Sequence, residues 1–99
     1  MTNVVIKRDH DVYYVQATGH ATGSEKVCSG ISSLLYAVAG WIINNEHMLR
    51  YHKISLKDGN SVIEWSGGPV AQAVYECVAI GLLQIEQSYP DFIKVDEIE

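Results

Sequence analysis

One histidine and one cysteine lie eight positions apart in the stretch GHATGSEKVCSGISS, residues 19–33. A cysteine attacks a carbonyl carbon only as the thiolate, and imidazole is the usual group that takes its proton. The apolar pattern predicts a helix that begins between Ser24 and Val27, which places Cys28 in the first turn. Free backbone N–H groups there favour an anion and can form an oxyanion hole. Cys28 and His20 are therefore a candidate nucleophile and base.

Two further residues are candidates for supporting this pair. Ser32 follows Cys28 by four residues and Glu25 precedes it by three, so each shares its helix face if the helix has already begun. Either side chain can orient His20 or bind a substrate. The alternative interpretation is a simple turn that leads into a helix whose cysteine packs in the core, because free cysteine is among the most buried residue types.

The second cysteine provides a contrast. Cys77 lies mid-helix on an apolar stripe without a histidine nearby, so we expect it to pack in the core. Because the two cysteines have no metal-ligand spacing, we expect free thiols and no metal site. Three large aromatic residues are expected in the core or at a dimer interface: Tyr36, Trp41 and Trp65.

The elements that must position these residues follow from the apolar periodicity. Strands are expected at residues 3–7, 12–18, 51–57, 60–65 and 92–98, and helices at 25–45 and 69–88. Hairpin turns are expected at residues 8–11 and at Asp58-Gly59. The resulting order, ββαββαβ, predicts a two-layer α+β fold in which helices cover one face of a mainly antiparallel sheet.

Length and composition indicate one folded domain over residues 1–99, with 47% hydrophobic and 19% charged residues. The net charge of −5 and the lack of a lysine and arginine cluster argue against nucleic-acid binding, and an acidic surface suits a basic partner. The N-terminus becomes polar within six residues, and no apolar run is expected to reach membrane-spanning length. We therefore expect a cytoplasmic protein without membrane contact.

The sequence resembles one known family, the bacterial ribosomal-processing cysteine proteases called Prp. The resemblance rests on residues 19–21 (GHA), on Val27-Cys28 and on Ser32, and the element order extends it over nearly the whole chain. It implies a catalytic dyad of His20 and Cys28, an active-site contribution from Ser32, and no cofactor. It also implies a homodimeric cytosolic endopeptidase that removes the N-terminal extension of a large-subunit ribosomal protein, the one numbered twenty-seven.

Two features of this chain differ from the family's usual pattern. Only residues 21–27 separate the histidine from the cysteine, whereas the family usually has a longer loop. Glu25 and Lys26 stand where the family has an aspartate followed by an apolar residue. An alternative hypothesis therefore stays open: a catalytically weak or inactive dimeric module that binds a ribosomal or phage structural protein.

Overall fold

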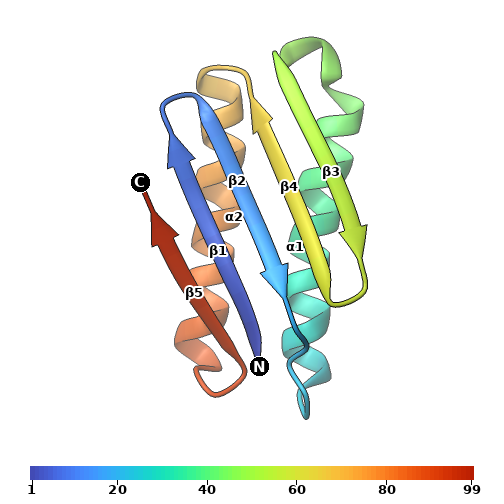
Figure 1. The fold of residues 1–99 in the computed structure, drawn as a ribbon, viewed down its shortest axis with the longest axis vertical. Coiled ribbons are helices and arrows are strands. Elements are labelled where there is room, and N and C mark those ends of the chain that lie inside the picture. Colours follow the sequence, from blue (N-terminus) through green and yellow to red (C-terminus); the bar gives the residue numbers. More distant parts are fainter.

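The computed structural model describes residues 1–99 as a five-stranded sheet with both helices on one of its faces (Figure 1). The elements in chain order are β1 (Thr2–Asp9), β2 (Val12–Thr18), α1 (Glu25–Asn44), a short 3₁₀ helix η1 (Glu46–Met48), β3 (Tyr51–Lys57), β4 (Asn60–Ser66), α2 (Pro69–Ser88) and β5 (Ile93–Ile98). The predicted α+β class and ββαββαβ order are confirmed, and η1 is the one element that the sequence pattern did not indicate.

The strands lie in the order β3-β4-β2-β1-β5. Three of the four pairings are antiparallel, and β5 pairs in parallel with β1, with Thr2 opposite Ile93. Side chains alternate between the two faces of a strand, so Val4 and Ile6 are buried beneath the helices while Lys7 is exposed on the open face. The mainly antiparallel sheet is therefore as predicted.

The core lies between the sheet and the two helices. Trp65 is fully buried and packs in tilted geometry against the rings of Tyr13 and Tyr75, with centroid separations of 6.1 and 6.3 Å. Its indole N–H donates to the backbone oxygen of Ala71 at 3.0 Å, which satisfies the one polar group of the buried ring. Because Ala71 is in the first turn of α2, this bond fixes the start of that helix against β4.

Local sequence signals explain where the helices begin. Ser24 caps α1, because its hydroxyl oxygen accepts a hydrogen bond from the Val27 N–H at 3.3 Å. Pro69 opens α2, where its fixed φ suits the first helical turn and its missing N–H costs nothing. The helix that carries Cys28 therefore begins within the predicted interval.

The prediction that Cys77 packs in the core is wrong, because this side chain is exposed. α2 is apolar on more than one face, and the bulky ring of Tyr75 takes the position against the sheet. Cys77 is turned toward the outer side of the helix layer as a result. Trp65 is buried in the core as expected, whereas Tyr36 is 65% exposed and lies outside the core, so that a place at a dimer interface stays a prediction for it.

Two smaller expectations also need correction. β1 continues through Asp9, so the first hairpin turn narrows to His10 and Asp11, with His10 at a positive φ of 56°. α1 is long and apolar enough to span a membrane by length and composition, although no such segment was expected. In this fold α1 buries one face, including Ile31 and Ile42, beneath the sheet, as the core helix of a globular domain does.

Candidate active site

His20 lies in the loop that follows β2, and a backbone contact holds this loop in place. Gly19, at φ 84°, donates its N–H to the carbonyl oxygen of Gly59 in the β3–β4 turn at 2.9 Å. A side chain at Gly19 would place its Cβ 2.7 Å from the backbone oxygen of Met1, so only glycine fits there. The backbone that carries the His20 side chain is therefore held between the start of β1 and the β3–β4 turn.

Cys28 is the fourth residue of α1 and is half-buried. Its thiol donates to the carbonyl oxygen of Ala21 at 3.7 Å, and the same oxygen accepts the N–H of Ser24 at 3.0 Å. The short loop thus folds back on the start of α1 as a tight turn, and Ala21 is buried within it. This turn brings the segment that carries His20 back to the helix that carries Cys28.

Both predicted residues line one pocket of about 260 Å³. The pocket is formed by the ends of β1 and β2, one face of α1 and the β3–β4 hairpin, and Ser32 lies in its wall one helical turn after Cys28. The remaining lining residues are Thr2, Ala17, Gly19, Ile31, Leu35, Tyr36, Leu56, Lys57, Asp58, Gly59, Asn60 and Ser61. The pocket combines an apolar wall on α1 with a polar wall on the hairpin.

The four predicted site residues do not all meet in this pocket. His20, Cys28 and Ser32 line it, whereas Glu25 is exposed in the first turn of α1 and lies outside the lining. A negative charge at that position interacts favourably with the positive end of the helix dipole and so stabilises the helix. The structure thus gives Glu25 a role in starting the helix and gives it no contact with His20.

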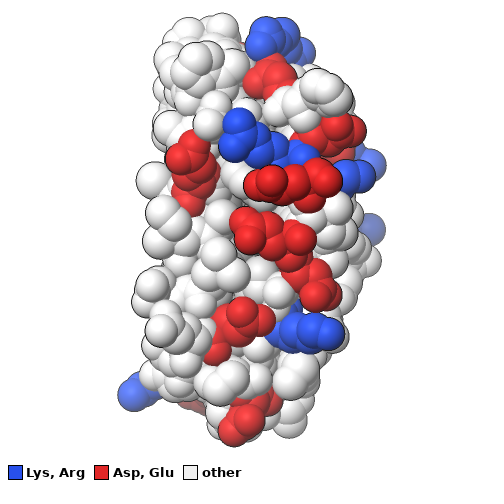
Figure 2. Space-filling model, turned by 90° about the vertical axis from the view of Figure 1, so that its left-hand side faces the viewer, with Lys and Arg blue, Asp and Glu red and all other residues white.

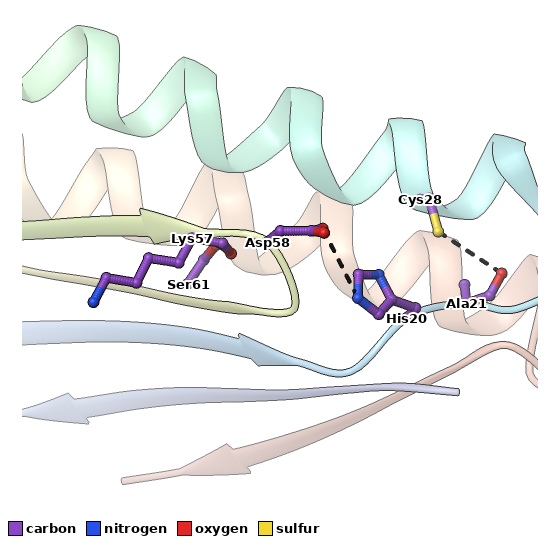
Figure 3. Close-up of polar contacts among 6 residues, drawn as sticks. All are labelled: His20, Ala21, Cys28, Lys57, Asp58 and Ser61. Atoms are coloured by element: carbon purple, nitrogen blue, oxygen red, sulfur yellow. Dashed lines mark hydrogen bonds and ion pairs between the residues drawn. The ribbon is translucent and has the colours of Figure 1, made fainter.

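His20 and Cys28 face the same space without a hydrogen bond between them. In Figure 3 the Nε2 atom of the ring points toward Asp58, and the Cys28 sulfur points toward the Ala21 oxygen. Catalytic hydrogen bonds are often long or misaligned in a substrate-free enzyme and form when substrate binds. The arrangement places an acceptor for the thiol proton at the same pocket as the thiol.

Asp58 is a pocket residue that no local sequence pattern indicates. Its Oδ1 atom lies 3.8 Å from Nε2 of His20. In the sequence, Asp58-Gly59 indicates only a hairpin turn. The signal that would have found it is strand pairing, because β2 and β4 align Thr18 with Asn60 and so carry the β3–β4 turn to the end of β2.

The start of α1 also supplies backbone donors. The Val27 N–H is used by the Ser24 hydroxyl and the Cys28 N–H by the Ser24 carbonyl at 3.2 Å. The amides of Glu25 and Lys26 make no hydrogen bond within the protein. If helix amides stabilise an oxyanion here, these two are the available donors.

The described residues contain no group of three or more His, Cys, Asp or Glu side chains placed to hold a metal ion. A thiol in the first turn of a helix, with an imidazole at the same pocket, is the arrangement used for nucleophilic catalysis by cysteine. The fold and the site therefore define a candidate cysteine hydrolase.

A family model described as cysteine protease Prp matches residues 1–94, and the chain belongs to this family of cysteine proteases. The resemblance inferred from the sequence is thereby confirmed. Comparison with curated protein sequences gives no match.

Solved structures agree with the family. A crystal structure of the Staphylococcus aureus ribosomal processing protease Prp with a covalently linked product peptide is 25% identical, with a TM-score of 0.82, and the match covers 98% of this chain and 99% of that one. The same protein with a substrate peptide is 22% identical, with a TM-score of 0.74 and coverage of 98% and 99%. SMU.848 from Streptococcus mutans is 17% identical, with a TM-score of 0.73 and coverage of 99% and 94%. The likeness extends over the whole fold.

Proposed function

We propose that this protein is an endopeptidase that removes the N-terminal extension of a bacterial large-subunit ribosomal protein, the one numbered twenty-seven. Membership of the Prp family supports a proteolytic role, and the similar Staphylococcus aureus protein binds a substrate peptide and a covalently linked product peptide. The observation that carries the proposal is that His20 and Cys28 line one pocket, which Ser32 also lines.

In this mechanism Cys28 is the nucleophile and His20 the base. The imidazole takes the thiol proton, and the thiolate attacks the scissile carbonyl carbon to form a tetrahedral adduct. Free helix amides stabilise the oxyanion, and the adduct collapses to a thioester as the leaving amine takes the proton back from His20. Water, activated by the same imidazole, then releases the acid product and restores the thiol.

A peptide cleavage assay tests this function. A synthetic peptide that spans the extension and the first residues of the mature ribosomal protein is incubated with the protein under reducing conditions, and the products are identified by mass spectrometry. We expect one cut, lost about a thousandfold or more in Cys28→Ala and in His20→Ala. Cys77→Ala is the matched control, because this exposed thiol lies on α2 away from the pocket. Absence of any cut by the unmodified protein would refute the proposal.

The second candidate function is a dimeric module that binds its protein partner without cutting it. The observation that favours it is the Cys28 thiol, which donates to the Ala21 oxygen instead of to His20. Alkylation by iodoacetamide at neutral pH separates the two, because only a thiolate reacts quickly. An enzyme requires Cys28 to react faster in the unmodified protein than in His20→Ala, which lacks the base. An equal rate of Cys28 in the two proteins would favour the binding module.

We further propose that two copies of the chain associate through the outer side of the helix layer. A groove of about 300 Å³ between α1 and α2 has only apolar lining residues: Leu34, Ala37, Val38, Trp41, Ala73, Val74, Cys77 and Val78. Ile43 and Ile80, also on these helices, are 58% and 62% exposed. Monomeric proteins rarely leave a continuous apolar patch of this kind in water, and a domain of 99 residues gains from burying more apolar surface.

The charge of the molecule supports a basic peptide as the substrate, and the site of action that we propose for this activity is the cytoplasm. Figure 2 shows the side of the molecule where β5 lies, and acidic side chains form a band along it with basic side chains beside and between them. With a net charge of −5, the protein attracts cationic peptides and repels nucleic acid. We therefore propose that nucleic acid is not a partner.

A further inference from the structure

We propose that Asp58 is a positioning residue that holds the neutral His20 ring in the tautomer with its proton on Nε2, so that Nδ1 is the base for Cys28. This inference rests on the proposed function and deepens it. It starts from one contact, in which Oδ1 of Asp58 lies 3.8 Å from Nε2 of His20. Figure 3 shows the carboxylate on one side of the ring, while the Nδ1 edge of the ring faces the side on which α1 and Cys28 lie.

The backbone builds this contact into the fold. Gly19, next to His20, donates to the oxygen of Gly59, next to Asp58, at 2.9 Å, so the two loops are joined one residue from each partner. Ser61 closes the hairpin by donating its hydroxyl to the Lys57 oxygen at 3.2 Å. Asp58 is therefore carried on a short, hydrogen-bonded turn whose position relative to the imidazole is fixed.

The chemistry of imidazole explains why such a neighbour matters. A neutral ring carries one proton, and the hydrogen bond made by one nitrogen decides whether the other is free to act as a base. A carboxylate only accepts hydrogen bonds when ionised, so Asp58 selects the tautomer with the proton on Nε2. The lone pair is then on Nδ1, the nitrogen on the Cys28 side of the ring.

One proton moves between Cys28, His20 and the leaving amine. The Cys28 S–H bond breaks, its proton forms a new bond to Nδ1, and the sulfur keeps the electron pair as a thiolate. The ring becomes an imidazolium whose Nε2–H faces Asp58, and the added positive charge strengthens the attraction between the two groups. When the leaving amine departs, the proton on Nδ1 passes to it and the original tautomer returns.

The Asp58–His20 pair contributes little to the folding stability of the free protein. The Asp58 side chain is 97% exposed and that of His20 57%, and an ion pair in water contributes little to stability. The separation of 3.8 Å also exceeds a direct hydrogen bond. A peptide that fills the pocket excludes water from both groups, which strengthens their attraction and draws Asp58 onto the ring.

Other ionisable groups at the pocket do not substitute for Asp58. Besides His20, the lining contains Cys28 and Tyr36 from α1 and Lys57 and Asp58 from the hairpin. Figure 3 shows the Lys57 side chain directed away from the imidazole. Asp58 is thus the only carboxylate in the lining, which makes a single substitution informative.

The test compares Asp58→Ala with Asp58→Glu. The first measurement is the tautomer of the neutral His20 ring, read from its ¹⁵N chemical shifts in alkaline buffer, and the second is peptide cleavage. We expect Asp58→Ala to mix the two tautomers and to lower kcat about tenfold with little change in KM, and Asp58→Glu to recover most of both. Asp9→Ala is the matched control, since it removes a hairpin carboxylate 2.8 Å from another histidine, His10, away from the pocket.

The outcomes separate this inference from the proposed function. If the unmodified protein cleaves through Cys28 and His20 while Asp58→Ala keeps both the Nε2–H tautomer and kcat, the function stands and the role of Asp58 is refuted. A lower kcat without a change of tautomer also refutes it. If no cleavage occurs at all, the proposed function fails, and the ¹⁵N shifts of Asp58→Ala still decide whether the carboxylate sets the ring's tautomer.

Discussion

At the scale of single residues, the contact between Gly59 and His20 ties the shape of a hairpin turn to the position of the imidazole. Gly59 adopts a φ of 75°, which suits glycine in a two-residue turn. A Cβ built on Gly59 would lie 3.0 Å from Nε2 of His20, closer than side chains normally approach. The turn therefore needs glycine both for its backbone and for the space that the ring occupies.

Gly59→Ala should therefore damage the site more than it damages the fold. The positive φ costs about 1 to 2 kcal/mol of stability for a residue with a side chain, and the added methyl group displaces the ring from Asp58. We expect kcat/KM for peptide cleavage to fall at least about tenfold. The measurements are cleavage kinetics together with Tm.

Gly68→Ala is the control for that substitution. Gly68 also has a φ of 75°, but the nearest atom to its Cβ position is in Arg50, 3.7 Å away, and it lies outside the pocket. This variant should lose stability and keep its activity while folded. Equal losses of activity in the two variants would show that backbone strain alone explains the effect.

Tyr75 gives a prediction about alkaline pH. Burial of the ring raises the pKa of its hydroxyl above the ordinary value of 10.0, and the carboxylates of Glu97 and Glu99 raise it further against a smaller opposing effect of Arg8. The folded state thus binds this proton more tightly than the unfolded chain does. Its contribution to stability is complete below the unfolded pKa and is lost as the pH rises through the folded one.

Tyr75→Phe, which has no such proton, should therefore lose less stability between about pH 9 and about pH 11 than the unmodified protein. Urea unfolding at both pH values provides the measurement. The same loss in both proteins would mean that ionisation of Tyr75 does not contribute to alkaline unfolding.

At the scale of elements, the cap of α1 links helix formation to the position of the thiol. Ser24 accepts the Val27 N–H with its side chain and the Cys28 N–H with its carbonyl oxygen. Its own N–H donates to Ala21, whose oxygen also receives the Cys28 thiol. One serine thus holds the tight turn, the helix start and the nucleophile together.

Ser24→Ala should destabilise the protein by about 1 kcal/mol, because the Val27 N–H loses its partner at the helix start. The first turn frays as a result, and cleavage should fall along with stability. Ser24→Asp retains an acceptor and should restore most of the stability. Urea unfolding measures the change, and an unaltered midpoint in Ser24→Ala would contradict the role of the cap.

Most of the elements could be predicted because their signals are local. Ser24 before an apolar stripe, Pro69 after two glycines and Asp58-Gly59 between alternating runs each mark a boundary in the sequence. The side of α2 that faces the core could not be predicted, because that helix is apolar on several faces and tertiary packing decides which is buried. The apolar stripe that contains Cys77 therefore predicts a core position, although the side chain is exposed.

The site was partly predictable for the same reason. His20 and Cys28 stand close in sequence, so residue chemistry and spacing select them as candidates, and both line one pocket. The approach of Asp58 to His20 depends on the pairing of β2 with β4, which no local pattern specifies. The exposed position of Glu25 likewise depends on where the helix axis points after the turn.

At the scale of the whole molecule, the apolar outer surface of the two helices predicts that two copies of the chain form a dimer. Ala73→Glu and Ile80→Glu each place a charge in or beside the apolar groove on an exposed side chain, so the monomer should still fold. We expect the mass in light scattering after gel filtration to change from two chains to one.

Asn3→Asp controls for the added negative charge, because Asn3 is exposed on the strand face opposite buried Val4 and should leave the dimer intact. Circular dichroism should be unchanged in all three variants. A monomeric mass for the unmodified protein at micromolar concentration would reject the dimer.

The parallel pairing of β1 with β5 has a consequence for how the protein is made. β5 is the last strand to be synthesised, and it pairs with the first, where Thr2 donates its N–H to the oxygen of Phe92 and also lines the pocket. Until β5 emerges from the ribosome, one edge of β1 has no partner and the pocket lacks the support of that contact. The pocket is therefore complete only when two strands from opposite ends of this fold have met, a contact of long sequence separation that forms late in folding.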